Sequence, residues 1–310
     1  MDGLNIRRHP SQSIIGTQTA GAIPDFSPAG RAAFEECYNR TSFLFHHELH
    51  QHEIFRWPSL IALGDRHPPM DPYSYWSNGK VQIDDGWESR GEPGYSLQQT
   101  LLNIESNDSL VIFKHLEQDP VFAPFLRDVQ QWILDLAGVR MRDDVTLRRG
   151  TILIASPWRI TPYHIDADVN FLFQIAGDKE IRVFDQANRD VLSHQELEDY
   201  FLGNLNGAVY HSGKEAGAKR YDLRPGCAIH IPLITGHWAQ NQAALSIALS
   251  VNFDIRSMAP LKRVYRVNGR LRKLGLSPKP PGVSEWRDKL KSNAIELLTL
   301  HRHLRNSEKS

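Results

Sequence analysis

The chain of 310 residues has little of what marks several classes of protein. Its two cysteines, Cys37 and Cys227, cannot build a framework of disulfide bonds and fit a reducing compartment. No run approaches the roughly 18 consecutive apolar residues that a membrane-spanning helix needs. The first residues, MDGLNIRR, contain no apolar stretch of the kind found in secretory signals. We therefore expect a cytoplasmic protein with no membrane partner.

Net charge is also missing, because 36 Lys and Arg balance 36 Asp and Glu and the pI is about 7.3. Proteins that bind nucleic acid over a broad surface carry an excess of cations, so nucleic acid is not expected as a partner. The balance is uneven along the chain, however. No acidic residue lies between Asp254 and Glu285, and segment 262–279 holds seven basic residues. The zero net charge does not exclude a local basic surface that steers an acidic substrate.

The remaining composition, 41% hydrophobic and 23% charged, is typical of a soluble globular protein with a sizeable core. Residues 1–25 predict an extended arm, and residues 26–144 a helical or irregular region that packs on a barrel. This region includes an amphipathic helix from about Phe122 to Gly138. Residues 145–256 predict the catalytic core, and residues 257–310 a basic helical extension.

From Val145 the periodicity of apolar residues changes to that of short strands separated by Gly, Pro and Asp. One helix interrupts them, from Ser193 to about Leu202, with Ser193 and Glu196 as a capping box. Eight short strands at this spacing predict a mainly β fold with flanking helices, in the jelly-roll or cupin style. The predicted strands are Thr151–Ala155, Tyr163–Ile165, Asn170–Ile175, Glu180–Phe184, Lys219–Leu223, Cys227–Ile231, His237–Gln240 and Leu245–Phe253.

A candidate metal site consists of His164 and Asp166, two residues apart at the end of a predicted strand, and His237 in a later strand. Residues i and i+2 of a strand point the same way, so the first pair can reach one ion. Two histidines and one carboxylate form the facial triad that holds Fe(II) and leaves three coordination positions open. With 14 histidines in the chain, about one His-x-Asp tripeptide arises by chance, so the surrounding residues decide.

Segments 161–179, 232–241 and 250–253 resemble the JmjC/cupin-like oxygenases that depend on Fe(II) and 2-oxoglutarate. The similarity is greatest to the branch of the asparaginyl hydroxylase that inhibits hypoxia-inducible factor, and it covers about Val145 to Phe253. It implies a double-stranded β-helix fold, with Fe(II) on the three residues above, 2-oxoglutarate as co-substrate and O₂ as oxidant. It also implies the following co-substrate residues: Lys179 and Thr161 at the far carboxylate, and Asn170 and Asn252 near the chelating end.

The family often adds a tyrosine from an earlier strand. Here Ser156 and Trp158 lie closest in sequence, and neither is assigned that role. Trp158, Tyr163 and Trp238 flank the metal ligands in sequence and are candidates for a substrate pocket, although such aromatic residues pack in a core at least as often.

The predicted function is 2-oxoglutarate-dependent hydroxylation of a C–H bond, with succinate and CO₂ as co-products. Asp166 at its position favours hydroxylation over halogenation. The substrate is open between a protein side chain, a peptide or amino acid, and a small metabolite. The alternatives are an N-methyl-lysine demethylase and a non-catalytic cupin-like regulator; two cysteines cannot furnish a zinc finger, which weakens the demethylase alternative.

Two further clusters have weaker interpretations. His46, His47, His50 and His52 have the wrong spacing for a zincin motif and are expected to form a surface cluster. A final helix from Ser284 to about Leu304 carries Leu290, Ile295, Leu298 and Leu300 as an apolar stripe. C-terminal helices mediate dimerisation in the resembling branch, so this stripe is compatible with a homodimer.

Overall fold

The computed structural model describes residues 28–70, 72–86 and 94–294. All eight predicted strands are present, and their bounds are β4 Val145–Ala155, β5 Ile160–His164, β6 Val169–Ala176, β7 Lys179–Val183, β8 Lys219–Leu223, β9 Cys227–Ile231, β10 His237–Asn241 and β11 Ser246–Ile255. Three more strands come from the region expected to be helical or irregular, namely β1 Phe43–His46, β2 Ser74–Ser77 and β3 Leu110–Phe113. The predicted arm, 1–25, lies outside the described residues.

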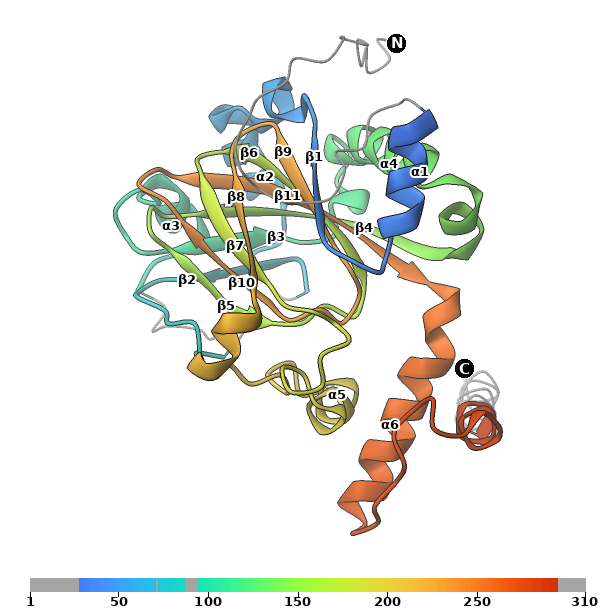
Figure 1. Cartoon of the computed structure of the whole chain (residues 1–310). Coiled ribbons are helices and arrows are strands. Elements are labelled where there is room, and N and C mark those ends of the chain that lie inside the picture. Colours follow the sequence, from blue (N-terminus) through green and yellow to red (C-terminus); the bar gives the residue numbers. More distant parts are fainter. Residues whose placement is uncertain (1–27, 71, 87–93, 295–310) are drawn as a thin grey trace, which may run out of the picture.

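The strands form two antiparallel sheets that face each other (Figure 1). The larger has seven strands in the order β1-β9-β6-β11-β4-β3-β2, and the smaller has four in the order β5-β10-β7-β8. Apolar side chains from both sheets meet between them, including Leu172, Ile229 and Ala248 from the larger sheet and Ile181 and Leu223 from the smaller. The protein is thus mainly β with flanking helices, arranged as a double-stranded β-helix.

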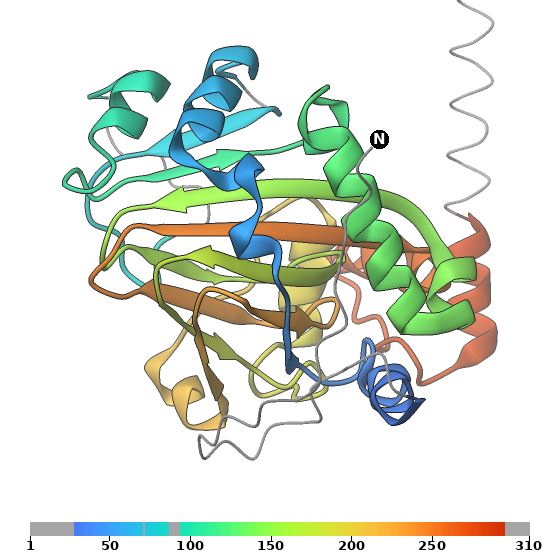
Figure 2. The same ribbon diagram turned by 90° about the horizontal axis from the view of Figure 1, so that it is seen from above.

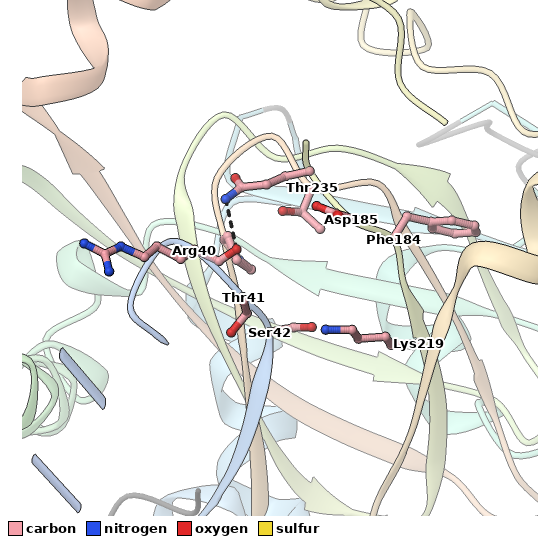
Figure 3. Close-up of a pocket in the computed structure, with 9 residues that line it drawn as sticks. Arg40, Thr41, Ser42, Phe184, Asp185, Lys219 and Thr235 are labelled. Carbon is pink, nitrogen blue, oxygen red and sulfur yellow. Dashed lines mark hydrogen bonds between the residues drawn. The ribbon is translucent and has the colours of Figure 1, made fainter. Parts of the chain in front are cut away.

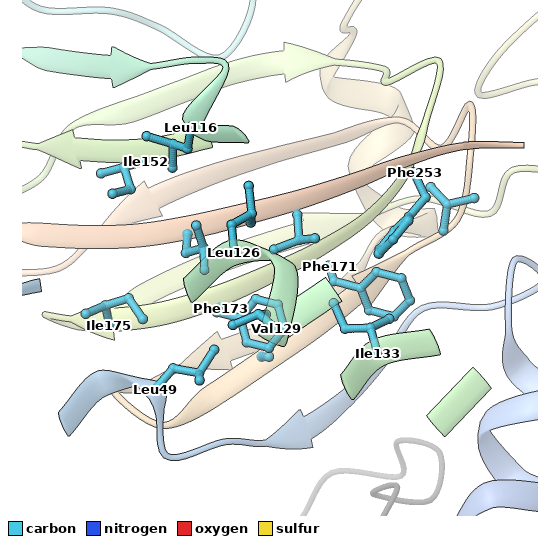
Figure 4. Packing of buried hydrophobic residues seen from close by; sticks show 14 of the residues in the cluster. Leu49, Leu116, Leu126, Val129, Ile133, Ile152, Phe171, Phe173, Ile175 and Phe253 are labelled. Carbon is cyan, nitrogen blue, oxygen red and sulfur yellow. The ribbon is translucent and has the colours of Figure 1, made fainter. Parts of the chain in front are cut away.

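The outer face of the larger sheet is covered by the long helix α4, Phe122–Asp144 (Figure 2). Leu126, Val129 and Ile133 of this helix pack on Phe171 and other side chains of the sheet (Figure 4). Almost every residue of β6 is therefore buried, on both faces of the strand. This explains why six of its eight residues are apolar instead of alternating with polar ones; the two exceptions are Asn170 and Gln174.

Six α-helices have both ends within the described residues, and α4 differs from its prediction. The helix was expected to end near Gly138, but it resumes after a break there and continues to Asp144. Gly138 has φ 76, a left-handed value that suits glycine and interrupts the helix for one residue. The other helices are α1 Pro28–Cys37, α2 Trp57–Arg66, α3 Leu97–Leu102, α5 His194–Phe201 and α6 Ala259–Lys273.

The predicted capping box of α5 is confirmed, since the Ser193 hydroxyl accepts the Glu196 N–H and the Glu196 carboxylate accepts the Ser193 N–H. Short 3-10 helices occupy the connections: η1 Leu49–Gln51, η2 Glu53–Phe55, η3 Leu116–Gln118, η4 Ser212–Gly217 and η5 Arg256–Met258.

The C-terminal extension begins with α6, which leads away from the barrel (Figure 1). Residues 285–294 are again helical. Leu290 there is 63% exposed, while Ile295, Leu298 and Leu300 of the predicted stripe lie outside the described residues. Within the described ranges, no helix has both the length and the apolar character needed to cross a bilayer.

Candidate metal centre

One end of the barrel brings His164, Asp166 and His237 together. A ligand atom from each side chain lies within 4.8 Å of the others, and no other group of three such residues exists in the part of the chain described here. His164 ends β5 and His237 begins β10, and the two residues are direct partners across these antiparallel strands. Their rings are 4.2 Å apart between centroids. The pairing of two strands that are distant in sequence therefore brings two of the three triad residues together.

Backbone carbonyls fix the orientation of both imidazole rings. Nδ1 of His164 lies 2.8 Å from the Pro162 carbonyl oxygen, and Nδ1 of His237 lies 2.9 Å from that of Thr235. A carbonyl oxygen only accepts hydrogen bonds, so each Nδ1 carries a proton, and Nε2 is the ring nitrogen left for a metal. This is the arrangement found for histidines that bind metal, where the second nitrogen donates to a fixed acceptor. Burial lowers the pKa of His164 to about 4, which keeps it neutral, as a metal ligand must be.

Asp166 lies in the loop after β5 and not in the strand itself. The expectation that it points the same way as His164 because both belong to one strand therefore does not apply. The loop is held by the Ile234 N–H, which donates to the Asp166 carbonyl oxygen over 2.8 Å. Its carboxylate Oδ2 is 3.8 Å from His237 Nε2. Burial by itself raises the pKa of Asp166, but the neighbouring imidazoles and the hydrogen bond from Asn170 outweigh it and lower the pKa. The carboxylate is thus ionised and ready to bind a cation.

Asn170 and Asn252 both lie beside the triad, and Ser250 joins them. Asn170 Nδ2 donates to Asp166 Oδ2 over 3.1 Å. Ser250 Oγ is 3.2 Å from Asn170 Oδ1 and 2.8 Å from Asn252 Oδ1. The hydroxyl has one hydrogen to share between the two amide oxygens; when it donates to Asn170 Oδ1, it leaves the NH₂ group of Asn170 facing Asp166. Ser250 was not predicted; its position two residues before Asn252, on the same face of β11, is the signal that could have found it.

Thr161 and Lys179 project from the same face as His237. Strand β10 lies between β5 and β7, and it pairs Ala239 with Thr161 on one side and Asn241 with Lys179 on the other. Directly opposed residues share a face of the sheet. Thr161 and His164 are three residues apart and would face opposite ways in a regular strand. A register shift between His237 and Ala239 places both on the inner face.

Lys179 is a buried cation without an anion. It is 5% exposed, and no ion pair or hydrogen bond of its side chain occurs among the described residues. Burial lowers its pKa from 10.5 to about 8. A desolvated ammonium group is costly unless an anion accompanies it. Its place therefore suits the carboxylate of a ligand that enters the barrel.

Four side chains that the sequence analysis considered for the site do not reach the inner face of the barrel. Ser156 is buried, and its hydroxyl accepts the Ser109 N–H over 2.6 Å and also bonds the Ile104 carbonyl oxygen. Trp158 is 56% exposed on the turn before β5. Tyr163 and Trp238 are buried on the side of their strands opposite the triad, where Tyr163 packs on Phe184. A role of Trp158, Tyr163 or Trp238 in a substrate pocket stays a prediction.

The rim of the barrel carries an ion pair that the sequence did not indicate. Arg149 on β4 binds the Asp168 carboxylate, and it lies opposite Asn252 in the sheet. Asp168 is two residues from Asp166, but a charged residue in a loop gives no sign of its partner in another strand. The pair places a guanidinium and a second carboxylate next to the metal site.

One of the histidines at positions 46–52, His47, is not on the surface as expected, whereas His46 and His52 are exposed. His47 is buried, with Nδ1 accepting the Leu49 N–H over 3.1 Å and Nε2 3.1 Å from the Cys227 carbonyl oxygen. Its packing on Phe173 explains the burial, which lowers its pKa to about 4. Both of its nitrogens are engaged by the backbone and are not available to a metal.

A cavity of about 80 Å³ lies near the same end of the barrel (Figure 3). Lys219 reaches toward Ser42 across it, and Thr235, whose carbonyl holds His237, lines it as well. The triad is not part of its lining. Ligand sites usually measure about 300 Å³ or more, so we assign no ligand to this cavity.

No family model matches the chain, and no curated protein does. Solved structures of YcfD from Escherichia coli are similar in fold. One has 15% identity to this chain and a TM-score of 0.45. The aligned part covers 86% of this chain and 67% of the YcfD chain. Another, described as a ribosomal oxygenase with cobalt and 2-oxoglutarate, has 16% identity and a TM-score of 0.44 over 86% and 66% of the two chains.

A third, with cobalt and succinic acid, has 13% identity and a TM-score of 0.43 over 85% of this chain and 64% of its own. The chain thus spans about two thirds of the length of these structures. At such identities the residue roles of YcfD are not transferred.

Proposed function

We propose that the protein is an Fe(II)- and 2-oxoglutarate-dependent oxygenase that hydroxylates a C–H bond. The observation that carries this proposal is that the facial triad of His164, Asp166 and His237 shares its barrel with Lys179, a buried cation without an anion. A triad alone fits several metal sites, and a buried lysine alone fits several anions. Together they fit a metal-chelating dicarboxylate that spans the distance between them.

The residues present fit the metal. Two neutral imidazoles and one carboxylate are the donor set of non-haem Fe(II) sites with three open positions. When bound, Fe(II) and 2-oxoglutarate supply the oxidative chemistry with O₂, and the substrate gains one oxygen atom. The chain's own part is to hold the ligand rings through the Pro162 and Thr235 carbonyl groups and to hold Asp166 through Asn170. Lys179 and Thr161 bind the far carboxylate, while Asn170 and Asn252 lie near the chelating end.

Depth in the barrel supports the roles given to Lys179 and Thr161. Counted along β10, Thr161 lies two residues from His237 and Lys179 lies four. At about 3.4 Å per residue, the Lys179 backbone is roughly 14 Å from that of His237 along the strand. The long lysine side chain covers part of this interval, and an extended diacid covers the rest. The chelating end of the ligand then faces the rim, where substrate enters.

The first experiment is anaerobic addition of Fe(II) and 2-oxoglutarate, observed through the visible charge-transfer absorption of the chelate. We expect the band in the wild-type protein and in Ser246→Ala, a variant of a buried residue at the far end of β11. We expect no band in His237→Ala or Asp166→Ala. A wild type without the band contradicts the oxygenase proposal, and a band that survives both ligand substitutions contradicts the ligand assignment.

Turnover separates an enzyme from a non-catalytic cupin-like regulator. Succinate release with candidate substrates supports the enzyme, and chelation without any succinate release supports the regulator. Mass spectrometry of the product distinguishes a gain of one oxygen, expected here, from the loss of a methyl group that a demethylase produces. The substrate class, the family branch, the cytoplasmic location and a homodimer formed through the C-terminal helix stay predictions.

A further inference from the structure

The C-terminal extension concentrates positive charge that the neutral chain as a whole conceals. Residues 256–294 contain eleven Lys and Arg against two acidic residues, Glu285 and Asp288. This segment follows β11 directly and includes α6 and the helical residues 285–294. A chain with zero net charge thus has one strongly cationic part, and the expectation of no nucleic-acid partner rested on the net charge alone.

Helix α6 sorts these charges onto one face. Arg263, Arg266, Arg270 and Lys273 follow one another at intervals of three, four and three residues, so they form a single stripe along the helix. With a rise of 1.5 Å per residue the stripe is about 15 Å long. We call these four residues the basic stripe.

The opposite face of α6 is fixed against the body of the protein. Val264, Tyr265, Asn268 and Gly269 are buried there. The Tyr265 ring stacks on Phe201 of α5 with centroids 5.7 Å apart. Since this face is occupied, the helix has no free apolar side to insert into a lipid surface, and the basic stripe faces away from the packing interface.

Other cations of α6 are neutralised, whereas most of the stripe is not. Arg272 binds Glu198 over 2.6 Å, and Lys262 binds Asp254 over 2.6 Å. Arg266, Arg270 and Lys273 are exposed, and within the described ranges their side chains have no acidic partner. Three unneutralised cations on one rigid face repel one another unless an external polyanion binds them.

We propose that the basic stripe binds the phosphate backbone of a single-stranded nucleic acid. Arginine, which forms most of the stripe, pairs with phosphate through two parallel hydrogen bonds. The same extension exposes Trp286 to 65%, with the Arg287 guanidinium 5.2 Å from the ring centroid. Proteins that bind single strands without sequence preference stack unpaired bases on exposed aromatic rings, and Trp286 offers such a ring in the same extension.

This surface does not depend on the proposed oxygenase activity. The like charge of the basic stripe opposes pairing of this face with a second copy of the chain, so a self-associated dimer through the stripe is disfavoured. An acidic protein offers charge but no reason for the exposed indole. A nucleic acid strand accounts for both features.

The test is fluorescence anisotropy of a labelled single-stranded RNA of about 20 nucleotides, titrated with the full chain over a range of salt concentrations. The variant is Arg266→Ala/Arg270→Ala/Lys273→Ala. The matched control is Lys80→Ala/Arg127→Ala/Arg140→Ala, which removes three exposed cations elsewhere and changes the net charge equally. Circular dichroism and the anaerobic chelate band establish that each variant is folded.

We expect the stripe variant to bind at least about tenfold more weakly and to lose about two from the slope of log affinity against log salt, since each phosphate contact contributes about 0.7. The control variant should bind like the wild type, and Trp286→Ala should weaken binding without changing the slope.

Three results overturn the proposal: no binding by the wild type at low salt, equal losses in the stripe and control variants, or tighter stripe-dependent binding to anionic vesicles or polyglutamate than to the RNA. Duplex RNA of the same length is the remaining comparison, and stronger binding to the duplex contradicts the choice of a single strand.

Discussion

Lys179 on β7 is the direct partner of Asn241 on β10, four residues along that strand from His237. The buried ammonium group and the metal triad therefore occupy one inner face at different depths. The protein holds this cation without an anion, and the free energy that this costs is recovered only when a carboxylate enters. The barrel is thus less stable empty than it would be with an apolar residue at position 179.

Lys179→Met should stabilise the protein while it weakens co-substrate binding. The pKa of Lys179 falls from 10.5 to about 8 on folding, so at neutral pH the charged form costs on the order of 3 kcal/mol in the folded state. We expect a higher midpoint in urea for the metal-free variant, and a loss of 2-oxoglutarate affinity with Fe(II) binding retained. A variant with unchanged affinity for 2-oxoglutarate would remove Lys179 from the site.

The same shift predicts a pH dependence for co-substrate binding. Below pH about 8 the folded protein carries Lys179 as an ammonium ion, and above it the amine is neutral. The affinity for 2-oxoglutarate should therefore fall up to tenfold for each pH unit above 8. Stability of the empty protein should move the other way and rise between pH 8 and 10.5, because there the unfolded chain binds the extra proton. Calorimetric titration and urea unfolding at pH 7 and pH 9.5 measure the two effects. In Lys179→Met both should disappear.

Asp166→Ala and Asp168→Asn form a matched pair two residues apart. Asp166 lies within the triad and should be essential for Fe(II) or Co(II) binding. Asp168 pairs with Arg149 at the rim instead. We expect Asp168→Asn to keep the affinity for Co(II), measured by the visible ligand-field bands of the bound ion. Equal loss of Co(II) in both variants would show that the carboxylates share the ligand role.

Ser250→Ala should loosen Asp166 through Asn170 without removing a ligand. Residues that hold a metal ligand in place by hydrogen bonds typically contribute 10- to 100-fold to metal affinity. We expect a loss toward the lower end of that range, with little change in the thermal midpoint of the metal-free protein, and recovery in Ser250→Thr, which keeps the hydroxyl. Ser246→Ala, four residues away where the serine bonds Gln174, serves as the control. A parallel loss of metal affinity and stability in both serine variants would indicate packing alone.

The eight strands of the core and helix α5 could be predicted because their signals are local. The capping pair of α5, Ser193 and Glu196, lies only three residues apart in the sequence, and alternation marks a strand within five residues. Strands β1, β2 and β3 were missed because each has four residues, and pairing decides them. Phe43 of β1 pairs with His230 of β9, far along the chain. No local pattern contains that contact.

The same distinction between local and long-range signals applies to the residues of the site. His164 and His237 were predicted from residue type and spacing, and Lys179 from the family resemblance. Ser250 and Arg149 could not be predicted, since their roles come from the register of β11 against β6 and β4. The shared face of Thr161 and His164 has a similar origin. It depends on an irregular register opposite His237, and regular alternation predicts the opposite.

The concentration of cations beyond β11 has a consequence for the isolated protein. Since residues 256–294 hold eleven basic and two acidic residues in a neutral chain, the remainder carries the compensating negative charge. Helix α6 leads away from the barrel (Figure 1), so we expect the centres of the two charges to be separated and the molecule to have a large electric dipole moment. Near its pI of about 7.3 such molecules attract end to end. Solubility at that pH should therefore increase as salt is added, because screening weakens the dipolar attraction.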